Sequence, residues 1–156
     1  MPPINLDNQN TENVHKFQYL GSYIAKDGDV GLEMDIRTRI GEASSVFQRL
    51  QPIWNCGAIS KVMKLRLYSS IVVLTATYAC VTWKTTAKAT KMINVFHRRC
   101  LRRILGILWC DHITNDEVMT CSEQTALHDI VATRRRRFIR QILRLPPSRH
   151  SHRMVT

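Results

Sequence analysis

The residues that decide the fold are 87–105, which read AKATKMINVFHRRCLRRIL. Apolar residues recur in this stretch at intervals of three and four, which is the spacing of one face of an α-helix. They are Ile93, Phe96, Cys100 and Ile104. The arginines fall on other faces of the same helix, as the pairs Arg98 with Arg102 and Arg99 with Arg103. The stretch therefore predicts a helix from about Ala87 to Leu105 that is buried on one face and strongly basic on the others.

Upstream of this helix, the same spacing predicts two more. Between residues 31 and 50 the apolar positions step by four and three, and we expect Pro52 to close that helix. Ser60 is a good N-cap residue for the next helix, whose apolar positions lead into the run Ile71–Val81. We expect this run to be buried.

Downstream, Thr114 and Glu117 have the spacing of a capping box at the start of a short helix. A last helix is expected from about Gln124 to Leu145, before Pro146 and Pro147 stop it. Its expected inward stripe is Leu127, Ile130, Val131, Phe138, Ile142 and Leu145.

The N-terminal part has a different pattern. Residues 14–25 are rich in aromatic and β-branched residues and are followed by Asp27-Gly28, a strong signal for a tight turn. The predicted fold is therefore mainly α, with a short N-terminal β-hairpin followed by a bundle of about four to five helices.

The charge is concentrated in one part of the chain. The 156 residues carry a net charge of +11, and basic residues exceed acidic ones only after residue 60. Such an asymmetry indicates a basic binding surface, so polyanions are the leading partners. A single domain of this length is too small for a whole polymerase core.

Several classes are not favoured. No secretory signal is evident at the start, and the longest apolar run is shorter than the roughly 20 residues that a bilayer requires. We therefore expect an intracellular protein whose cysteines are free thiols. These are Cys56, Cys80, Cys100, Cys110 and Cys121.

Catalytic and metal signatures are weak. The dense carboxylate set is expected to hold only turn and helix N-terminal charges. It consists of Asp27, Asp29, Glu33 and Asp35. Paired zinc ligands at finger spacing, a glycine-rich phosphate loop and a nucleophile elbow are all missing from the sequence. No catalytic or metal-ligating residue is therefore predicted.

The arginine clusters carry the strongest signal. Like-charged residues four apart on a helix repel each other unless an anion lies across them, and from Lys84 to Cys110 there are seven bases and no acid. Part of a second run, Arg134–Arg137, must still face inward. These features favour contact with nucleic-acid phosphates. The candidate nucleic-acid-binding residues are Lys61, Lys64, Arg66, Arg98, Arg99, Arg102, Arg103, Arg134, Arg135, Arg136, Arg137 and Arg140.

Four stretches of the sequence together resemble a known family. They are Phe17-Gln18-Tyr19-Leu20-Gly21, Lys64-Leu65-Arg66-Leu67-Tyr68, Arg99-Cys100-Leu101-Arg102-Arg103-Ile104-Leu105-Gly106 and Asp111-His112-Ile113-Thr114-Asn115. With them, the chain from about Ile4 to Arg149 resembles non-LTR (LINE-type) retrotransposon endonuclease–reverse transcriptases. It departs from the usual pattern at Gln18, at Ala79 and Cys80, where a Tyr-Gly context is usual, and at residues 138–140.

The resemblance implies a segment-by-segment organisation. Residues 1–30 would be a primer-grip-like β segment, 31–110 a thumb-like helical region, 111–147 a basic C-terminal helical region and 148–156 a basic tail. It also implies contact with a primer–template. The primer-grip-like residues are Phe17, Gln18, Tyr19, Leu20 and Gly21.

The catalytic palm of such an enzyme uses a Tyr/Phe-x-Asp-Asp turn to hold two metal ions, and this sequence contains no Asp-Asp. We therefore expect a primer–template-contacting part that is not an enzyme on its own. No cofactor is expected in this chain, because magnesium would belong to the absent palm. The expected partners are RNA–DNA hybrid, RNA or DNA, and a palm-containing reverse transcriptase chain, in a nuclear or cytoplasmic ribonucleoprotein without a membrane.

Two alternatives stay open at this point. The chain could be a degenerate element fragment that acts only as a protein-interaction module, through apolar surface left by a lost palm. It could also be a thumb that works in trans with a palm on a separate chain. A weaker third alternative is attachment of the arginine-rich helices to anionic membrane surfaces.

Overall fold

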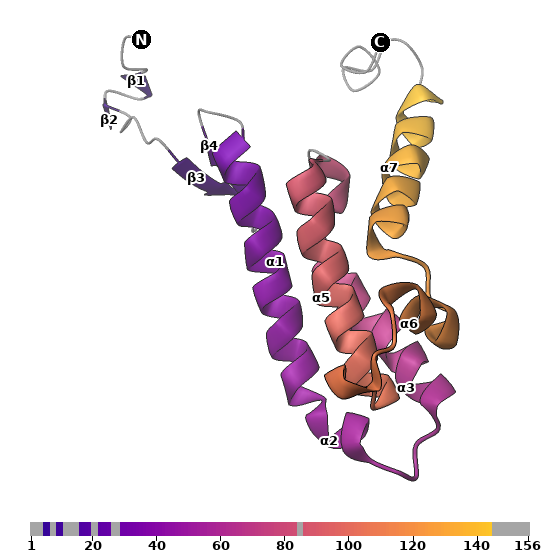
Figure 1. Ribbon diagram of the computed structural model, residues 1–156. Helices are drawn as coiled ribbons and strands as arrows, with labels where there is room; N and C mark the ends of the chain where they lie inside the picture. Colours follow the sequence, from indigo (N-terminus) through magenta and orange to yellow (C-terminus); the bar gives the residue numbers. More distant parts are fainter. Residues whose placement is uncertain are drawn as a thin grey trace.

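A computed structural model describes the backbone of residues 5–6, 9–10, 16–19, 22–25, 29–83 and 86–144, and side chains from Glu33 onward except Trp109. The described part is mainly helical (Figure 1), which confirms the predicted class. The helical elements are α1 (Asp29–Arg49), α2 (Gln51–Asn55), α3 (Lys61–Leu67), the π-helix η1 (Tyr68–Val73), α4 (Leu74–Ala76), the 3-10 turn η2 (Cys80–Thr82), α5 (Ala87–Leu105), the 3-10 turn η3 (Trp109–Asp111), α6 (Asn115–Ser122) and α7 (Leu127–Leu143).

Two pairs of short antiparallel strands precede the helices. β1 (Asn5–Leu6) pairs with β2 (Gln9–Asn10), and β3 (Lys16–Tyr19) pairs with β4 (Ser22–Ala25). Only the backbone of these strands is described. The β-hairpin as a folded part of the bundle and the primer-grip-like role of Phe17–Gly21 therefore stay predictions.

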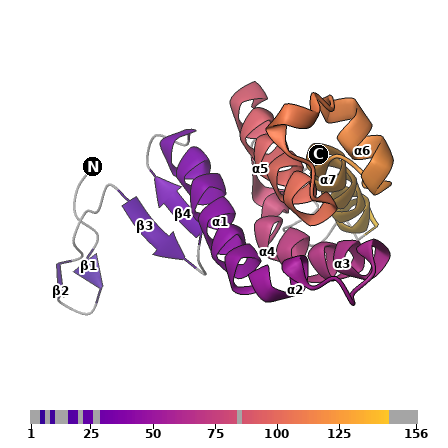
Figure 2. The ribbon, with the colours of Figure 1, turned by 60° about the horizontal axis from the view of Figure 1, so that its bottom comes forward.

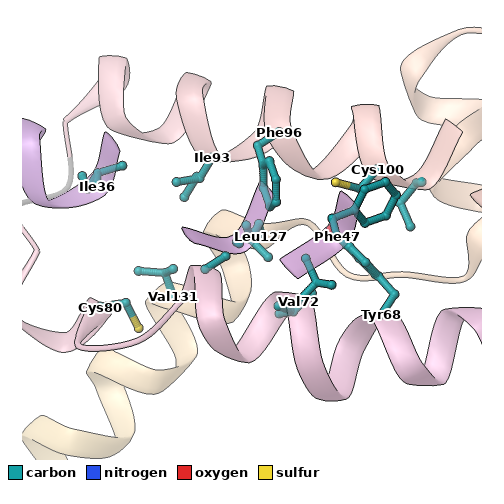
Figure 3. Close-up of a cluster of buried hydrophobic side chains, with 14 of the residues drawn as sticks. Ile36, Phe47, Tyr68, Val72, Cys80, Ile93, Phe96, Cys100, Leu127 and Val131 are labelled. Carbon is teal, nitrogen blue, oxygen red and sulfur yellow. The ribbon is translucent and has the colours of Figure 1, made fainter. Parts of the chain in front are cut away.

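Helix α5 is the centre of the bundle, because α1, α2, α3, α6 and α7 all contact it. In both ribbon views it stands between α1 and α7 (Figures 1 and 2). Figure 3 shows Ile93, Phe96 and Cys100 pointing from α5 into a layer of apolar side chains that includes Val72 and Leu127. The apolar face predicted for this helix is confirmed, and burial of that face supplies the main driving force for its packing.

The helix ends follow local chemistry. Ser60 and Thr86 are N-caps whose hydroxyl oxygens accept backbone N–H groups of α3 and α5. The predicted capping box is present: Thr114 Oγ1 accepts from Glu117 N at 3.2 Å, and a Glu117 carboxylate oxygen accepts from Thr114 N at 2.6 Å. Gly106, with φ of 72°, ends α5 in the left-handed conformation that glycine adopts without strain.

Three further turns use left-handed backbone without glycine. The φ angles are 56° at Ala79, 51° at His112 and 52° at Glu123. Each lies where a helical segment begins or ends. A Cβ atom in this region is close to the following carbonyl oxygen, so these turns are held by the packing around them.

The predicted role of Pro52 is wrong. Helix α1 ends at Arg49, and Pro52 then lies in the first turn of α2. A proline has no N–H to lose in that position, and its fixed φ suits a helix start. The residue therefore begins a helix instead of closing one, and the chain continues without a loop.

The expected burial of the run Ile71–Val81 is only half correct. Val72, Val73 and Ala76 are buried, but Ile71, Leu74 and Tyr78 are exposed. The run forms part of η1 and all of α4, and a helical segment packed on one side must leave its other face outward.

The carboxylate set was predicted to hold only turn and helix N-terminal charges, and Asp35 corrects this. It is 1% exposed, and its Oδ2 accepts from Trp83 Nε1 at 3.1 Å. Arg39, also buried, places Nε 3.9 Å from Asp35 Oδ1 and donates from Nη1 to Glu42 at 2.8 Å. Asp35 thus anchors α1 to the chain just before α5, through a partner 48 positions away that helix periodicity does not reveal.

Candidate nucleic-acid interface

The two arginine pairs of α5 lie on different faces. Arg99 and Arg103 are exposed and continue a solvent stripe that begins with Lys91 and Val95 at steps of four residues. Arg98 and its partner four residues later are only partly exposed. The prediction that each arginine pair lies on one face of the helix is confirmed. One pair faces outward, and the other pair lies against the neighbouring helices.

The inner pair is partly used for folding. Arg102 Nη2 donates to the carbonyl oxygen of Ile113 at 2.7 Å and lies 3.3 Å from Asn115 Oδ1. On the same flank of α5, Asn94 Oδ1 accepts from the backbone N–H of His128 at 3.3 Å. Arg102 therefore holds the connection between α5 and α6, a role that its charge alone did not indicate.

The outer pair borders a cleft. A cavity of about 430 Å³ lies between the last turns of α1, the start of α2 and α5. Arg99 and Arg103 line it together with Gln48 and Gln51. The Gln51 carboxamide has two orientations to choose from. In one, its Nε2 donates to Asn55 Oδ1 at 3.0 Å; in the other, its oxygen accepts from Arg103 Nη2 at 2.9 Å and from Arg103 Nε at 3.1 Å. In the second orientation, one carboxamide oxygen accepts from two N–H groups of Arg103 and positions its guanidinium, which favours recognition of an anion by the remaining donors.

A second hollow of about 360 Å³ adjoins the C-terminal end of α5. Lys61, Lys64 and Arg103 are among its lining residues. Lys64 is nevertheless buried, and its Nζ donates to the backbone carbonyl of Trp54 at 2.8 Å. We therefore remove Lys64 from the candidate contact set: it satisfies a carbonyl at the end of α2 instead of facing solvent. Lys61 and Arg66 are exposed.

The basic run of α7 divides in the same way. Arg134 donates to the hydroxyl and to the carbonyl oxygen of Thr77, so it faces inward as part of the run was expected to do. Arg135 is also partly buried, whereas Arg136, Arg137 and Arg140 are exposed. The first half of α7 is thus fixed to the bundle, and the second half offers cations to solvent.

The expected inward stripe of α7 ends early. Leu127 and Val131 are buried, but Phe138 is 45% exposed, and Ile139 and Leu143 are exposed as well. The last turns of α7 extend beyond the N-terminal end of α5 in Figure 1. The predicted burial of Phe138 is therefore wrong, because the core that would cover it does not extend that far along the helix. The final stripe position, Leu145, lies outside the described residues.

A buried polar cluster lies under α5. Tyr68 Oη and His97 Nδ1 are 2.7 Å apart. Burial lowers the pKa of His97 to about 4 and raises the pKa of the Cys100 thiol to about 12. Burial also raises the pKa of Tyr68 well above its usual value. All three groups are therefore uncharged at neutral pH, so this cluster serves packing and supplies neither a thiolate nor an imidazolium.

The salt bridges of the described carboxylates go to residues other than the outer arginine pair. Glu33 pairs with Arg37 at 2.8 Å and with Lys88 at 2.9 Å. Among the described residues, no carboxylate forms a salt bridge with Arg99 or Arg103. Their charge is therefore available to an external anion.

Other candidate sites are not seen within the described residues. No group of three or more His, Cys, Asp or Glu side chains could hold a metal ion there. Of the helices in these described ranges, none contains an apolar stretch of the length that a membrane span requires. The five cysteines are free, with Cys80 and Cys100 buried and Cys110 and Cys121 exposed.

Comparisons with protein-family models, with curated proteins and with solved structures gave no match. Sequence reasoning found Arg99 and Arg103, but it missed Ser44, Gln48 and Gln51, which line the cleft beside them. These three polar residues stand near a helix end, and no local pattern distinguishes them from ordinary solvent-exposed positions.

Proposed function

We propose that this chain binds nucleic acid through the phosphate backbone, as the thumb-like and C-terminal part of a LINE-type reverse transcriptase. In this proposal the N-terminal strands form a primer-grip-like hairpin, the helices of residues 31–110 form the thumb, and those of residues 111–147 form the basic C-terminal region. The chain catalyses no polymerisation by itself, and it acts within an intracellular ribonucleoprotein. Magnesium belongs to the palm of the parent enzyme.

The observation that carries the proposal is the outward pair Arg99 and Arg103. Two guanidinium groups four residues apart repel each other, and an anion across them would relieve that repulsion. Lys61 and the exposed arginines of α7 add further positive charge. Arginine suits phosphate because its planar fork can donate two parallel hydrogen bonds. Contacts of this kind position a strand without reading its bases.

The test is a titration of the whole chain against labelled RNA–DNA hybrid, duplex DNA and single-stranded RNA, followed by anisotropy at several salt concentrations. If about five phosphates are neutralised, the log–log slope of affinity against salt should lie near −4 to −5 for duplex. We expect the hybrid to bind best, because its minor groove offers 2′-hydroxyl and backbone contacts.

The matched pair of variants is R99Q/R103Q and R37Q/K88Q. Each removes two positive charges, but the second pair already neutralises Glu33. We expect the first variant to flatten the salt slope by about two and the second to leave it nearly unchanged. Equal effects of the two variants, or binding that does not depend on salt, would overturn the proposal.

A second candidate function is a protein-interaction module, either for a palm chain in trans or in a degenerate fragment. The exposed Phe138, Ile139 and Leu143 on α7 favour it, because apolar side chains grouped on one helix mark contact surfaces. Replacement of Phe138 by Ser would weaken such an association and leave the salt-dependent binding unchanged.

A further inference from the structure

The cleft beside the outer arginine pair has the dimensions of a small-ligand site. Its volume of about 430 Å³ falls in the range of about 300–1,000 Å³ that such sites occupy. Its walls come from three elements far apart in the sequence: Ser44 and Gln48 on α1, Gln51 on α2, and Arg99 and Arg103 on α5. Packing of α1 and α2 against α5 therefore forms it, and no single helix makes it.

The lining of the cleft combines two chemistries. Its apolar part includes Phe47 and Phe96, which are 9% and 7% exposed, so that only small parts of the rings reach the surface. The Phe47 ring is fixed by stacking on Trp54, with 5.2 Å between ring centroids. A planar apolar group could lie against this surface without moving the core.

The polar part of the lining is cationic and directional. Arg103 is held by the Gln51 carboxamide, and Arg99 is one helical turn before it. Four residues of α-helix span about 6 Å along the axis, so the two guanidinium groups can engage neighbouring phosphates of one strand. Gln48 is exposed beside them and can both donate and accept hydrogen bonds.

We propose that this cleft binds one unpaired nucleotide at the end of a nucleic-acid strand. Its phosphate and the next phosphate of the strand would lie on Arg99 and Arg103, and its base would enter the cleft against the edges of Phe47 and Phe96. A base inside a duplex is stacked and paired and does not reach such a cavity, so the site recognises an overhang. The inference rests on the proposed backbone binding and adds to it a preference for strand ends.

The experiment compares one duplex with blunt ends and the same duplex with a single-nucleotide overhang, both titrated against the full chain. An edge-to-face contact with an aromatic ring is weaker than full stacking on its face, so the overhang should bind about two- to tenfold tighter. A 2-aminopurine at the unpaired position should lose fluorescence on binding as it enters the cleft. Equal affinity for the two duplexes would overturn the cleft site and leave backbone binding in place.

Two substitutions separate cleft occupation from charge. S44F places a ring in the cavity and keeps every cation, whereas S45F adds the same ring at the exposed neighbouring position, which does not line the cleft. We expect S44F to bind both duplexes with the affinity of the blunt one, and S45F to retain the preference. Q48W, at an exposed lining residue, gives a second cleft-filling variant should S44F fold poorly.

The outcomes are distinct. A preference for the overhang that S44F and Q48W both retain would overturn the cleft as its cause. Absence of salt-dependent binding to either duplex would overturn the proposed function, and the cleft inference with it.

Discussion

The arginines of α5 and those in the second half of α7 share a residue type and a four-residue spacing, but they lie in different surroundings. On α5, Arg102 holds the next connection and Arg103 is held by Gln51, so these cations have fixed positions. On α7, Arg136, Arg137 and Arg140 are exposed on turns that carry exposed apolar residues as well. Equal charge patterns therefore serve two purposes: arginines on a packed helix make positioned contacts, and arginines on a projecting helix attract anions without fixed geometry.

The largest expected effect comes from breaking the packed region itself. Asp35→Ala removes the acceptor of Trp83 Nε1 and the buried carboxylate beside Arg39, which keeps its contact with the exposed Glu42. Loss of one partner of a buried ion pair costs about 3–5 kcal/mol. We expect the free energy of urea unfolding to fall by that amount.

The control is Glu42→Ala, which removes the exposed partner of the same arginine. Exposed pairs contribute about 0–1 kcal/mol, so this variant should stay near the wild type. An equal loss in both variants would contradict the central role of Asp35.

The next largest expected effect is a dependence of folding stability on pH, caused by the buried His97 in the packed region. The pKa of His97 is about 4 in the folded chain, against an ordinary value of 6.5. Below pH 6.5 the unfolded chain therefore binds a proton that the folded chain does not, and stability falls as the pH drops toward 4. The full shift corresponds to about 3 kcal/mol.

This pH effect is measured by urea unfolding at pH 7.5, 6, 5 and 4.5. His97→Gln should flatten the profile between pH 6.5 and 4.5. The lowered pKa values of Glu33 and Glu117 add a loss of their own only at lower pH, as those carboxylates become protonated. A profile that His97→Gln leaves unchanged would show that another group titrates there.

A smaller difference should separate single arginines of the two helices. Arg102→Ala removes two contacts to the connection before α6, and we expect a loss of about 1–2 kcal/mol in unfolding free energy. Arg140→Ala, on the projecting part of α7, should lie within about 0.5 kcal/mol of the wild type. Similar losses at both positions would remove the distinction between the two helices.

The smallest effect sharpens the comparison in binding. R136K/R140K keeps the charge of the α7 cations, and because they are exposed we expect the affinity for duplex to change by less than about twofold. R99K/R103K also keeps the charge but loses the planar fork that Gln51 positions. Its affinity should fall about fivefold at the same salt concentration, and an unchanged affinity would mean that charge alone acts at the cleft.

Local patterns predicted much of the helical fold. The spacing of Ile93, Phe96 and Cys100 was sufficient to place α5 and its buried face, and the side chains of Ser60 and Thr114 marked two helix starts. These features depend on neighbours within one or two turns, which a single sequence contains.

What the sequence did not reveal depends on distant contacts. Asp35 was predicted to be a solvent-exposed charge, but Trp83 Nε1 donates a hydrogen bond to it in the buried interior. Lys64 was predicted to contact nucleic acid, but its ammonium group donates to the Trp54 carbonyl. Phe138 continues the apolar spacing of α7, but the hydrophobic core does not extend as far along the helix as this residue. Gln51 had no signal of its own, because its role arises only where α2 meets α5.

The left-handed turns at Ala79, His112 and Glu123 have a consequence for the engineering of this chain. The backbone of each residue is held in a conformation that only glycine adopts freely, so replacement by glycine, which removes the Cβ atom, can make the folded protein more stable there. Relief of about 1 kcal/mol at each turn is of the order expected from the cost of left-handed backbone for a residue with a Cβ atom. The three positions form a reserve of thermal stability that leaves the cleft and its arginines untouched.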